Sequence, residues 1–156
     1  GATTMTLLRA VGESGQVISY DTREDMLDQA LANVRLSTFD IANLHFRKKD
    51  IYEGIDDSEL DRVVLDLAEP WRVVPHASGA LVPGGILFSF LPTILQVHDL
   101  TNALRSQGTF NLIETFEIMI RPWSVGSRSV RPSHRTTGHT GFITTARKSS
   151  PRPDNR

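Results

Sequence analysis

Three aspartates follow apolar, strand-like stretches of the sequence. Asp21 ends QVISYD, Asp50 follows LHFRKK, and Asp66 follows RVVL. In a sheet of parallel strands the carboxyl ends meet at one edge, and ligands bind at that edge. Each aspartate alone has a structural explanation, because carboxylates are also common helix caps and loop residues. The set of three is better explained by a ligand site.

The first two aspartates fit recognition of an adenosine-containing cofactor. A carboxylate at Asp21 could accept hydrogen bonds from both ribose hydroxyls, which NAD and S-adenosylmethionine both offer. Asp50 could accept from an adenine amino group, with Ile51 as an apolar neighbour of the ring. Gly1 and Ala2 precede a helical pattern and fit the end of a glycine-rich turn that lets a cofactor approach the backbone.

Asp66 is the strongest candidate for catalysis. It ends the most apolar run, and an acid there could reach both a cofactor and a substrate base, orienting the base and stabilising positive charge that develops on it. We therefore expect Asp66 to be both a catalytic and a cofactor-binding residue. Trp71, in the proline-containing segment that follows, could stack on an unstacked base, or it could simply fill a gap between a helix and the sheet.

The composition is that of an ordinary globular protein. Among 156 residues, 39% are hydrophobic and 22% are charged, which suffices for a core. Without cysteine the chain has no disulfide or thiolate zinc site, and its five histidines show no paired ligand spacing, so we expect no metal. We find no membrane-spanning run or signal peptide and expect a cytoplasmic location.

Charge is distributed unevenly along the chain. Residues 1–120 hold 9 basic and 17 acidic residues, a balance of −8, whereas residues 121–156 hold 8 and 1, a balance of +7. A basic C-terminal third indicates a phosphate-facing surface, to which we assign Arg121, Arg128, Arg131 and Arg135. The alternative is that these arginines pair with the acidic remainder of the chain.

Strand-like and helical patterns alternate along the sequence. Helices are expected at residues 3–11, 23–36 (capped by Asp21 or Thr22), from Pro70, and 93–108; strands are expected at 16–20, 43–48, 62–65, 86–91, 110–121 and 140–147, with a turn at 82–85. Met26, Leu27, Ala30 and Val34 should face inward.

This order predicts an α/β fold with a doubly wound, mostly parallel sheet and helices on both faces. The last two strands lack a helical crossover and should form an antiparallel hairpin at the edge of the sheet. We expect one domain over residues 1–148 and a disordered basic tail over 149–156.

Four stretches of the sequence resemble a known family. GATTMTLLRAVGESGQVISYD, VVLDLAEPW, LPTILQV and RPSHRTTGHTGFITTARK, in this order, are similar to the tRNA (adenine-58-N1) methyltransferases of archaea and actinobacteria. The resemblance implies a Rossmann-like class I methyltransferase fold that uses S-adenosylmethionine. It also implies methylation of adenine N1 in the T-loop of tRNA by a homotetramer.

The resemblance also implies roles for single residues. Gly1 corresponds to the last glycine of the cofactor motif, Asp21 to the ribose-binding acid, Asp50 to the adenine-side acid and Asp66 to the catalytic aspartate. Gln96 corresponds to a position near the mouth of the active site. The C-terminal signature, near the substrate face in such enzymes, contains Arg131, His134, Arg135, His139 and Thr140; Thr136 stands where methionine is expected.

One departure from the family concerns the start of the chain. Family members precede the equivalent of Gly1 with a β-rich domain, a helix and the first, central strand. We therefore expect an N-terminally truncated catalytic domain whose first strand is missing and which is inactive by itself. Two other interpretations stay open: a non-catalytic RNA-binding subunit of a tRNA methyltransferase complex, and a nicotinamide-dependent oxidoreductase, for which no tyrosine–lysine pair is evident.

Overall fold

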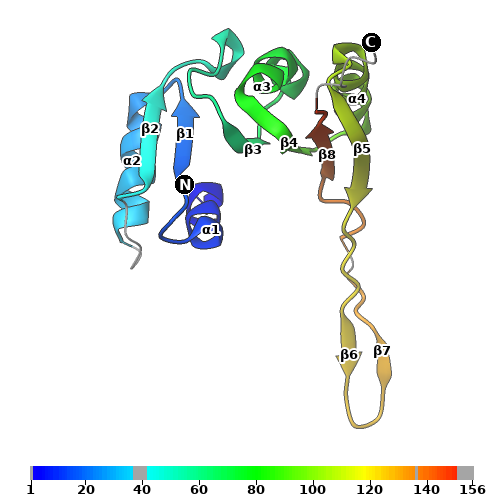
Figure 1. The fold of residues 1–156 in the computed structure, drawn as a ribbon. Coiled ribbons are helices and arrows are strands. Elements are labelled where there is room, and N and C mark those ends of the chain that lie inside the picture. Colours follow the sequence, from blue (N-terminus) through cyan, green and yellow to red (C-terminus); the bar gives the residue numbers. More distant parts are fainter. Residues whose placement is uncertain (1, 37–41, 136, 151–156) are drawn as a thin grey trace. The chain divides into compact units, whose positions relative to one another are not determined.

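The computed structural model describes residues 2–36, 42–135 and 137–150. Its contacts divide the chain into two compact units, Gly1–Gly54 and Ile55–Arg156 (Figure 1). The interpretation of residues 1–148 as one domain stays a prediction. Within the described ranges, no helix has the length and apolar character needed to cross a membrane.

The first unit contains two helices and a two-stranded parallel sheet. Its elements are α1 (Ala2–Val11), β1 (Val17–Asp21), α2 (Glu24–Arg35), β2 (Leu44–Lys48) and a 3-10 turn, η1 (Ile51–Glu53). The strands run in register from Val17 beside Leu44 to Asp21 beside Lys48. Asn43 ties the α1–β1 turn to β2, because its side-chain amide donates to the carbonyl oxygens of Gly12 at 2.9 Å and Gly15 at 2.7 Å.

The core of the first unit is small. Leu8, Val17 and Val34 are buried, and Met5, Leu7, Val11 and Leu44 pack around them. Two details of the prediction for α2 are wrong. Met26, in the first turn of α2, is 37% exposed rather than inward, because it lines a pocket instead of packing into this core. The N-cap is Arg23, which has no side-chain cap; Asp21 instead accepts from the backbone N–H of Arg23.

The second unit contains a mixed sheet. Its elements are β3 (Leu60–Leu65), a 3-10 turn η2 (Pro70–Val73), α3 (Val74–Ala80), β4 (Leu81–Leu91), α4 (Ile94–Gln107), β5 (Phe110–Glu117), β6 (Trp123–Val125), β7 (Val130–Pro132) and β8 (Phe142–Lys148). The strand order is β3-β4-β8-β5, with β6 and β7 forming a separate hairpin. β3 and β4 are parallel, whereas β8 is antiparallel to both β4 and β5. This α/β arrangement, with an antiparallel C-terminal pair, confirms the predicted fold class.

The last two strands of the sheet pair antiparallel at its edge, as predicted. Within this pair, β8 lies inside the sheet and β5 forms the edge. Burial accompanies this order: Thr144 and Ala146 of β8 are 0% and 2% exposed, whereas Leu112 and Phe116 of β5 are 69% and 45% exposed. The more buried strand takes the position with two neighbours.

The predicted tail begins beside the sheet. The backbone N–H of Ser149 donates to the carbonyl oxygen of Thr109 at 2.8 Å, so the chain stays paired one residue beyond β8. The rest of the tail that the sequence predicted to be disordered, residues 151–156, lies outside the described residues.

The predicted turn at residues 82–85 is part of β4. The register with β3 shifts between the pairs Leu60–Leu81 and Arg62–Ile86, so this segment bulges within one long strand. Gly84 has φ +83°, and a Cβ on Gly85 would lie 2.9 Å from the carbonyl oxygen of Val82. Glycine is needed at both positions, and a bulge accommodates them without ending the strand.

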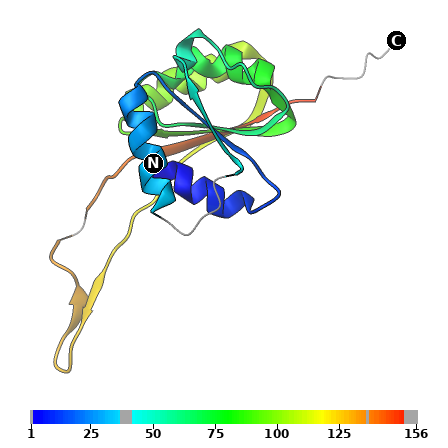
Figure 2. The same cartoon turned by 90° about the vertical axis from the view of Figure 1, so that its left-hand side faces the viewer.

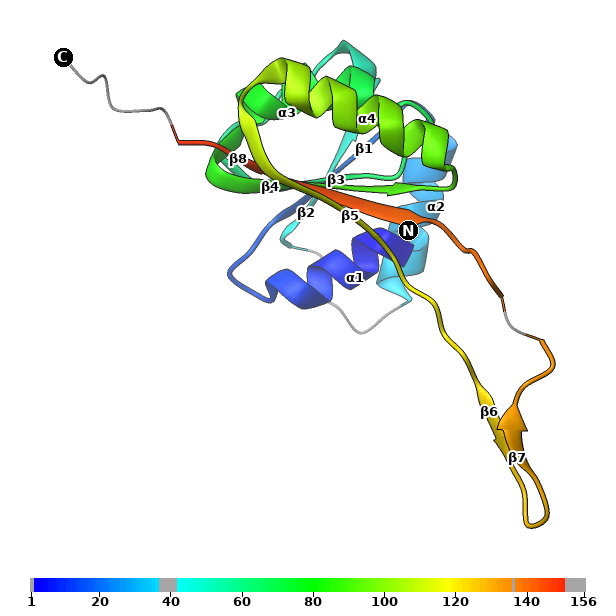
Figure 3. The ribbon, with the colours of Figure 1, turned by 90° about the vertical axis from the view of Figure 1, so that its right-hand side faces the viewer.

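Helices α3 and α4 cover one face of this sheet (Figure 3). From α4, Val97, Leu100 and Leu104 are buried, which matches the helical spacing of the sequence. The helix begins and ends as predicted. Thr93 is its N-cap and accepts from the backbone N–H of Gln96, and Gly108 is its C-cap with φ +71°.

Candidate functional site

Two predicted carboxylates lie at the same edge of the sheet in the first unit. Asp21 ends β1 and Asp50 follows β2, and the two strands are parallel. The Oδ1 atom of Asp21 accepts from the backbone N–H of Arg23 at 2.9 Å, and Oδ1 of Asp50 accepts from that of Tyr52 at 2.9 Å. Each carboxylate is thus held by a local turn at the position where the sequence predicted a cofactor acid.

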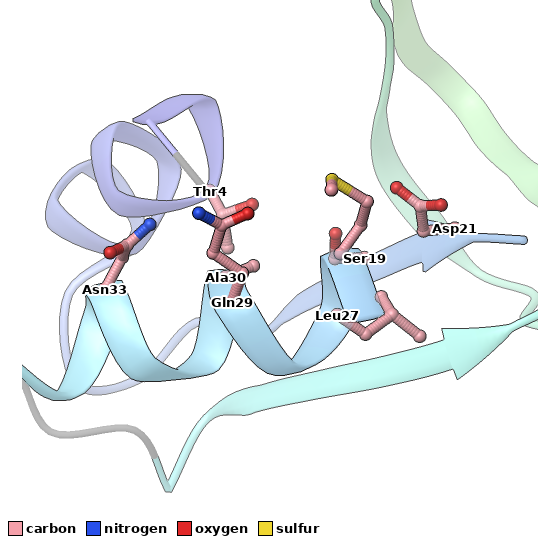
Figure 4. A pocket seen from close by; sticks show the side chains of 8 residues that line it. Thr4, Ser19, Asp21, Leu27, Gln29, Ala30 and Asn33 are labelled. Carbon is pink, nitrogen blue, oxygen red and sulfur yellow. The ribbon is translucent and has the colours of Figure 1, made fainter. Parts of the chain in front are cut away.

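Asp21 also lines a pocket of about 150 Å³ in the first unit (Figure 4). The remaining lining residues come from α1, β1 and α2, and they are Thr4, Ser19, Met26, Leu27, Gln29, Ala30 and Asn33. The volume is below the roughly 300–1,000 Å³ of typical small-molecule sites, so this pocket by itself would hold only part of a nucleoside cofactor. Ala2 is exposed at the start of α1, and Gly1 lies outside the described residues.

A second set of predicted residues lies at one edge of the sheet in the second unit. β3, β4 and β5 point in one direction, because β3 is parallel to β4 and β8 is antiparallel to both β4 and β5. Their carboxyl ends therefore meet at the edge where Asp66 follows β3 and where β8 begins. Asp66 is exposed, and within the described part of the chain its carboxylate has no hydrogen bond or ion pair. Trp71 is half-buried in η2, directly after the buried Pro70.

Gln96 is connected directly to the segment that carries Asp66. Its side-chain Nε2 donates to the carbonyl oxygen of Ala68 at 2.9 Å. Its Oε1 accepts from the hydroxyl of Thr93 at 2.7 Å, so both ends of the amide are held. Gln96 is therefore tied to the backbone two residues after Asp66.

His139 contacts two residues that the sequence analysis did not single out. Its Nε2 lies 2.8 Å from the carbonyl oxygen of Pro92, and its Nδ1 contacts Oε1 of Glu117. The Pro92 carbonyl, followed by the Glu117 carboxylate, raises the pKa of His139 above its ordinary value, against a lowering by desolvation. Glu117 lies inside the strand expected at residues 110–121, so the sequence does not mark it as a strand-end acid like Asp21.

The remaining predicted substrate residues lie in an arm formed by residues 118–135, which follows β5. The arm contains β6 and β7 and extends away from the sheet of the second unit (Figure 2). The guanidinium of Arg121 lies 5.9 Å from the ring centroid of Trp123, and Arg131 Nη1 donates to His134 Nε2 at 2.6 Å. Arg128 and Arg135 are exposed.

Two threonines of the C-terminal signature complete the set. Thr140 is exposed between the arm and β8. Thr136 lies outside the described residues.

The structure thus forms two groups of candidate residues, one in each unit. Asp21 and Asp50 belong to the first, and Asp66, Gln96 and His139 to the second. Among the residues that the structure describes, no cluster of three or more His, Asp or Glu side chains could hold a metal ion.

The family model described as "tRNA methyltransferase complex GCD14 subunit" matches residues 1–133. The chain belongs to this family. A curated relative from Methanocaldococcus jannaschii, named tRNA (adenine(57)-N(1)/adenine(58)-N(1))-methyltransferase TrmI, is 36% identical over 94% of this chain and 61% of its own length. The tRNA (adenine(58)-N(1))-methyltransferase TrmI of Thermus thermophilus is 37% identical over 95% of this chain and 58% of its own length.

A solved structure has the same fold as this chain. The crystal structure named as a SAM-dependent O-methyltransferase from Thermotoga maritima superposes with a TM-score of 0.91 and 32% identity, over 99% of this chain and 57% of that one. The methyltransferase fold that the sequence predicted is therefore confirmed. The chain spans about 60% of the length of these two curated relatives.

Proposed function

We propose that the intact protein is an S-adenosylmethionine-dependent tRNA methyltransferase that acts on N1 of adenine 58 in the T-loop, in the cytoplasm. Two curated relatives at 36% and 37% identity carry N1 methylation of this adenine in their names. The observation that carries the proposal is the exposed carboxylate of Asp66, which follows β3 at the carboxyl edge and has no protein partner among the described residues. Such a carboxylate is available to a substrate.

The residues of the first unit fit the cofactor. Asp21 lines the pocket beside the start of α2, and its fixed carboxylate can accept from ribose hydroxyls. Asp50 at the neighbouring strand end can accept from the adenine amino group. S-adenosylmethionine bound there would supply the methyl group. Gly1 and Ala2 would lie at the methionine side of the same cofactor, as the resemblance implies.

Asp66 would orient the target base and stabilise its charge. When N1 of adenine gains a methyl group, its lone pair forms the new bond, and positive charge spreads to the N6 amino group. A carboxylate that accepts from N6 fixes the ring and favours this charge more in the transition state than in the ground state. Trp71 lies in η2, five residues after Asp66, and its half-buried ring offers an aromatic face on which the base could stack.

The arm would bind the RNA. Arg128 and Arg135 are exposed there, and Arg121, Arg131 and His134 lie on the same arm. An arm that carries several guanidinium groups suits the phosphate backbone of a folded RNA. tRNA is the substrate that this surface would hold.

The same arm supports the proposal that the intact protein is a homo-oligomer, a tetramer as the resemblance implies. Six of its apolar side chains are each at least 56% exposed, and they are Ile118, Met119, Ile120, Trp123, Val125 and Val130. Apolar surface of this kind is typical of association sites. Light scattering tests the assembly: a monomeric mass for the intact protein at micromolar concentration would contradict it.

The experiment that tests the function is product mapping. The intact protein is incubated with S-adenosylmethionine and an unmodified tRNA transcript, and the nucleosides are analysed by mass spectrometry. We expect 1-methyladenosine, lost when adenine 58 is replaced by guanine. An O-methylated nucleoside would instead support the O-methyltransferase chemistry in the name of the Thermotoga maritima structure. Binding of tRNA without any methylated product would support a non-catalytic subunit.

A further inference from the structure

Both ring nitrogens of His139 are engaged by acceptors. Nε2 lies 2.8 Å from the carbonyl oxygen of Pro92, and Nδ1 contacts Oε1 of Glu117. A carbonyl oxygen and an ionised carboxylate can only accept, so this arrangement favours a ring with a hydrogen on each nitrogen, the imidazolium form. In this arrangement His139 has no nitrogen left with which to bind a substrate.

The His139 ring joins two strand ends of the sheet. Glu117 is the last residue of β5, and Pro92 directly follows β4, so the ring links the two carboxyl ends across β8. The side chains of His139 and Glu117 are 46% and 28% exposed, which leaves the pair accessible but partly shielded. Phe142 at the start of β8 packs near the ring, with centroids 4.8 Å apart.

Pro92 leads directly to the contact that holds the Asp66 segment. The next residue, Thr93, is the N-cap of α4 and donates to Oε1 of Gln96. Gln96 in turn donates to the carbonyl oxygen of Ala68, two residues after Asp66. A continuous path therefore runs from Glu117 through His139 and the start of α4 to the segment that carries the proposed catalytic carboxylate.

We propose that His139 and Gln96 are positioning residues that fix the segment after β3, and with it Asp66, by anchoring the start of α4. This inference rests on the proposed function only for the role of Asp66. It gives both residues an indirect role in place of the direct substrate contacts that the sequence suggested. A displacement of about 1 Å in a reacting group can cost on the order of a hundredfold in rate, so anchoring of this kind matters for turnover.

The test compares His139→Gln, Glu117→Gln and Gln96→Leu with His98→Gln, an exposed histidine of α4, as the matched control. Hydrogen exchange is measured in the intact protein at the amides of residues 66–69 and 92–96. We expect faster exchange at residues 66–69 in all three variants and wild-type exchange in the control. Unchanged exchange at these residues in Gln96→Leu would overturn the proposal, whatever the activity.

Kinetics provide the second readout. Loss of positioning should lower kcat by about ten- to a hundredfold with little change in KM for tRNA, because Asp66 acts in the transition state. A raised KM with an unchanged kcat would overturn the proposal and make His139 or Gln96 a substrate contact. The double variant of His139→Gln and Gln96→Leu should lower kcat by less than the product of the two single-variant factors, because both residues act on one segment.

The readouts separate this inference from the proposed function. If the intact protein methylates no tRNA, the proposed function is wrong. Hydrogen exchange at residues 66–69 still tests whether His139 and Gln96 position the segment after β3. Nitrogen NMR of His139 should show that both ring nitrogens stay protonated to a higher pH in the wild type than in Glu117→Gln, because the pKa of the ring is raised by the Pro92 carbonyl and also by the Glu117 carboxylate, which this variant lacks. Equal titration of His139 in the wild type and in Glu117→Gln would overturn the proposed anchor.

Discussion

The carboxylate of Asp21 accepts a hydrogen bond from the backbone N–H of Arg23 at 2.9 Å, at the point where β1 passes into α2. The contact fixes the carboxylate beside the pocket of the first unit. A group held in this way loses little further freedom when it binds a ligand. The same turn that ends the strand therefore prepares the proposed ribose contact.

Asp21→Ala should weaken the binding of S-adenosylhomocysteine by about 1.5–3 kcal/mol, since hydrogen bonds to a charged acceptor are lost. Titration calorimetry of the intact protein measures this change. Asp28→Asn, on the exposed face of α2, is the matched control and should bind normally. Equal affinity in Asp21→Ala and the wild type would remove Asp21 from the cofactor site.

The exposed arginines of the arm should contribute to tRNA binding through phosphates. Arg128→Gln and Arg135→Gln should each reduce the slope of log affinity against log salt by roughly one unit or less. Arg105→Gln, an exposed arginine of α4, is the control. Unchanged salt dependence in both arm variants would assign these arginines to contacts within the protein.

Two buried serines should respond in opposite ways to substitution by alanine. The hydroxyl of Ser89 is buried with no hydrogen-bond partner among the described residues, whereas that of Ser78 lies 2.7 Å from the hydroxyl of Thr109. Ser89→Ala should leave stability unchanged or raise it by about 1 kcal/mol, and Ser78→Ala should lower it by a similar amount. Chemical denaturation measures both, and a large loss in Ser89→Ala would reveal a partner for its hydroxyl.

The raised pKa of His139 predicts a pH dependence of stability. Because the pKa in the folded state lies above that of the unfolded chain, the contribution is fully present below about pH 6.5 and is lost as the pH rises through the folded-state pKa. Melting temperatures of the wild type should therefore fall more steeply than those of His139→Gln above neutral pH. Parallel curves would show that His139 does not stabilise the fold through its charge.

Much of the fold could be predicted from local patterns. The helix between Thr93 and Gly108 agrees with its prediction to within a residue, because its cap, apolar spacing and terminal glycine all point to the same bounds. The bulge at Gly84 was missed because glycines that end a strand and glycines that bend one look the same in a sequence. The edge position of the last two strands could be predicted, but not which of them is outermost, since the burial of β8 depends on its partners.

The site could be predicted where it depends on local sequence patterns, but not where it depends on contacts between distant residues. Asp21 and Asp66 lie at strand ends as expected, because strand ends can be inferred from apolar runs. The contacts of His139 could not be predicted, since Pro92 and Glu117 lie 47 and 22 residues away in sequence. The backbone carbonyl oxygens of Pro92 and Ala68 accept hydrogen bonds from side chains, and because every residue has such an oxygen, the sequence does not indicate which one is used.

The most direct measurement is single-turnover methylation of a T-loop tRNA by the intact protein and its Asp66→Asn variant, with melting temperatures taken alongside. Asparagine keeps the size of the side chain but removes the negative charge that would face the cationic adenine. We predict a rate about a hundred- to a thousandfold lower, with cofactor and tRNA affinity and melting temperature unchanged. A near-normal rate in a stable variant would contradict the catalytic role of Asp66.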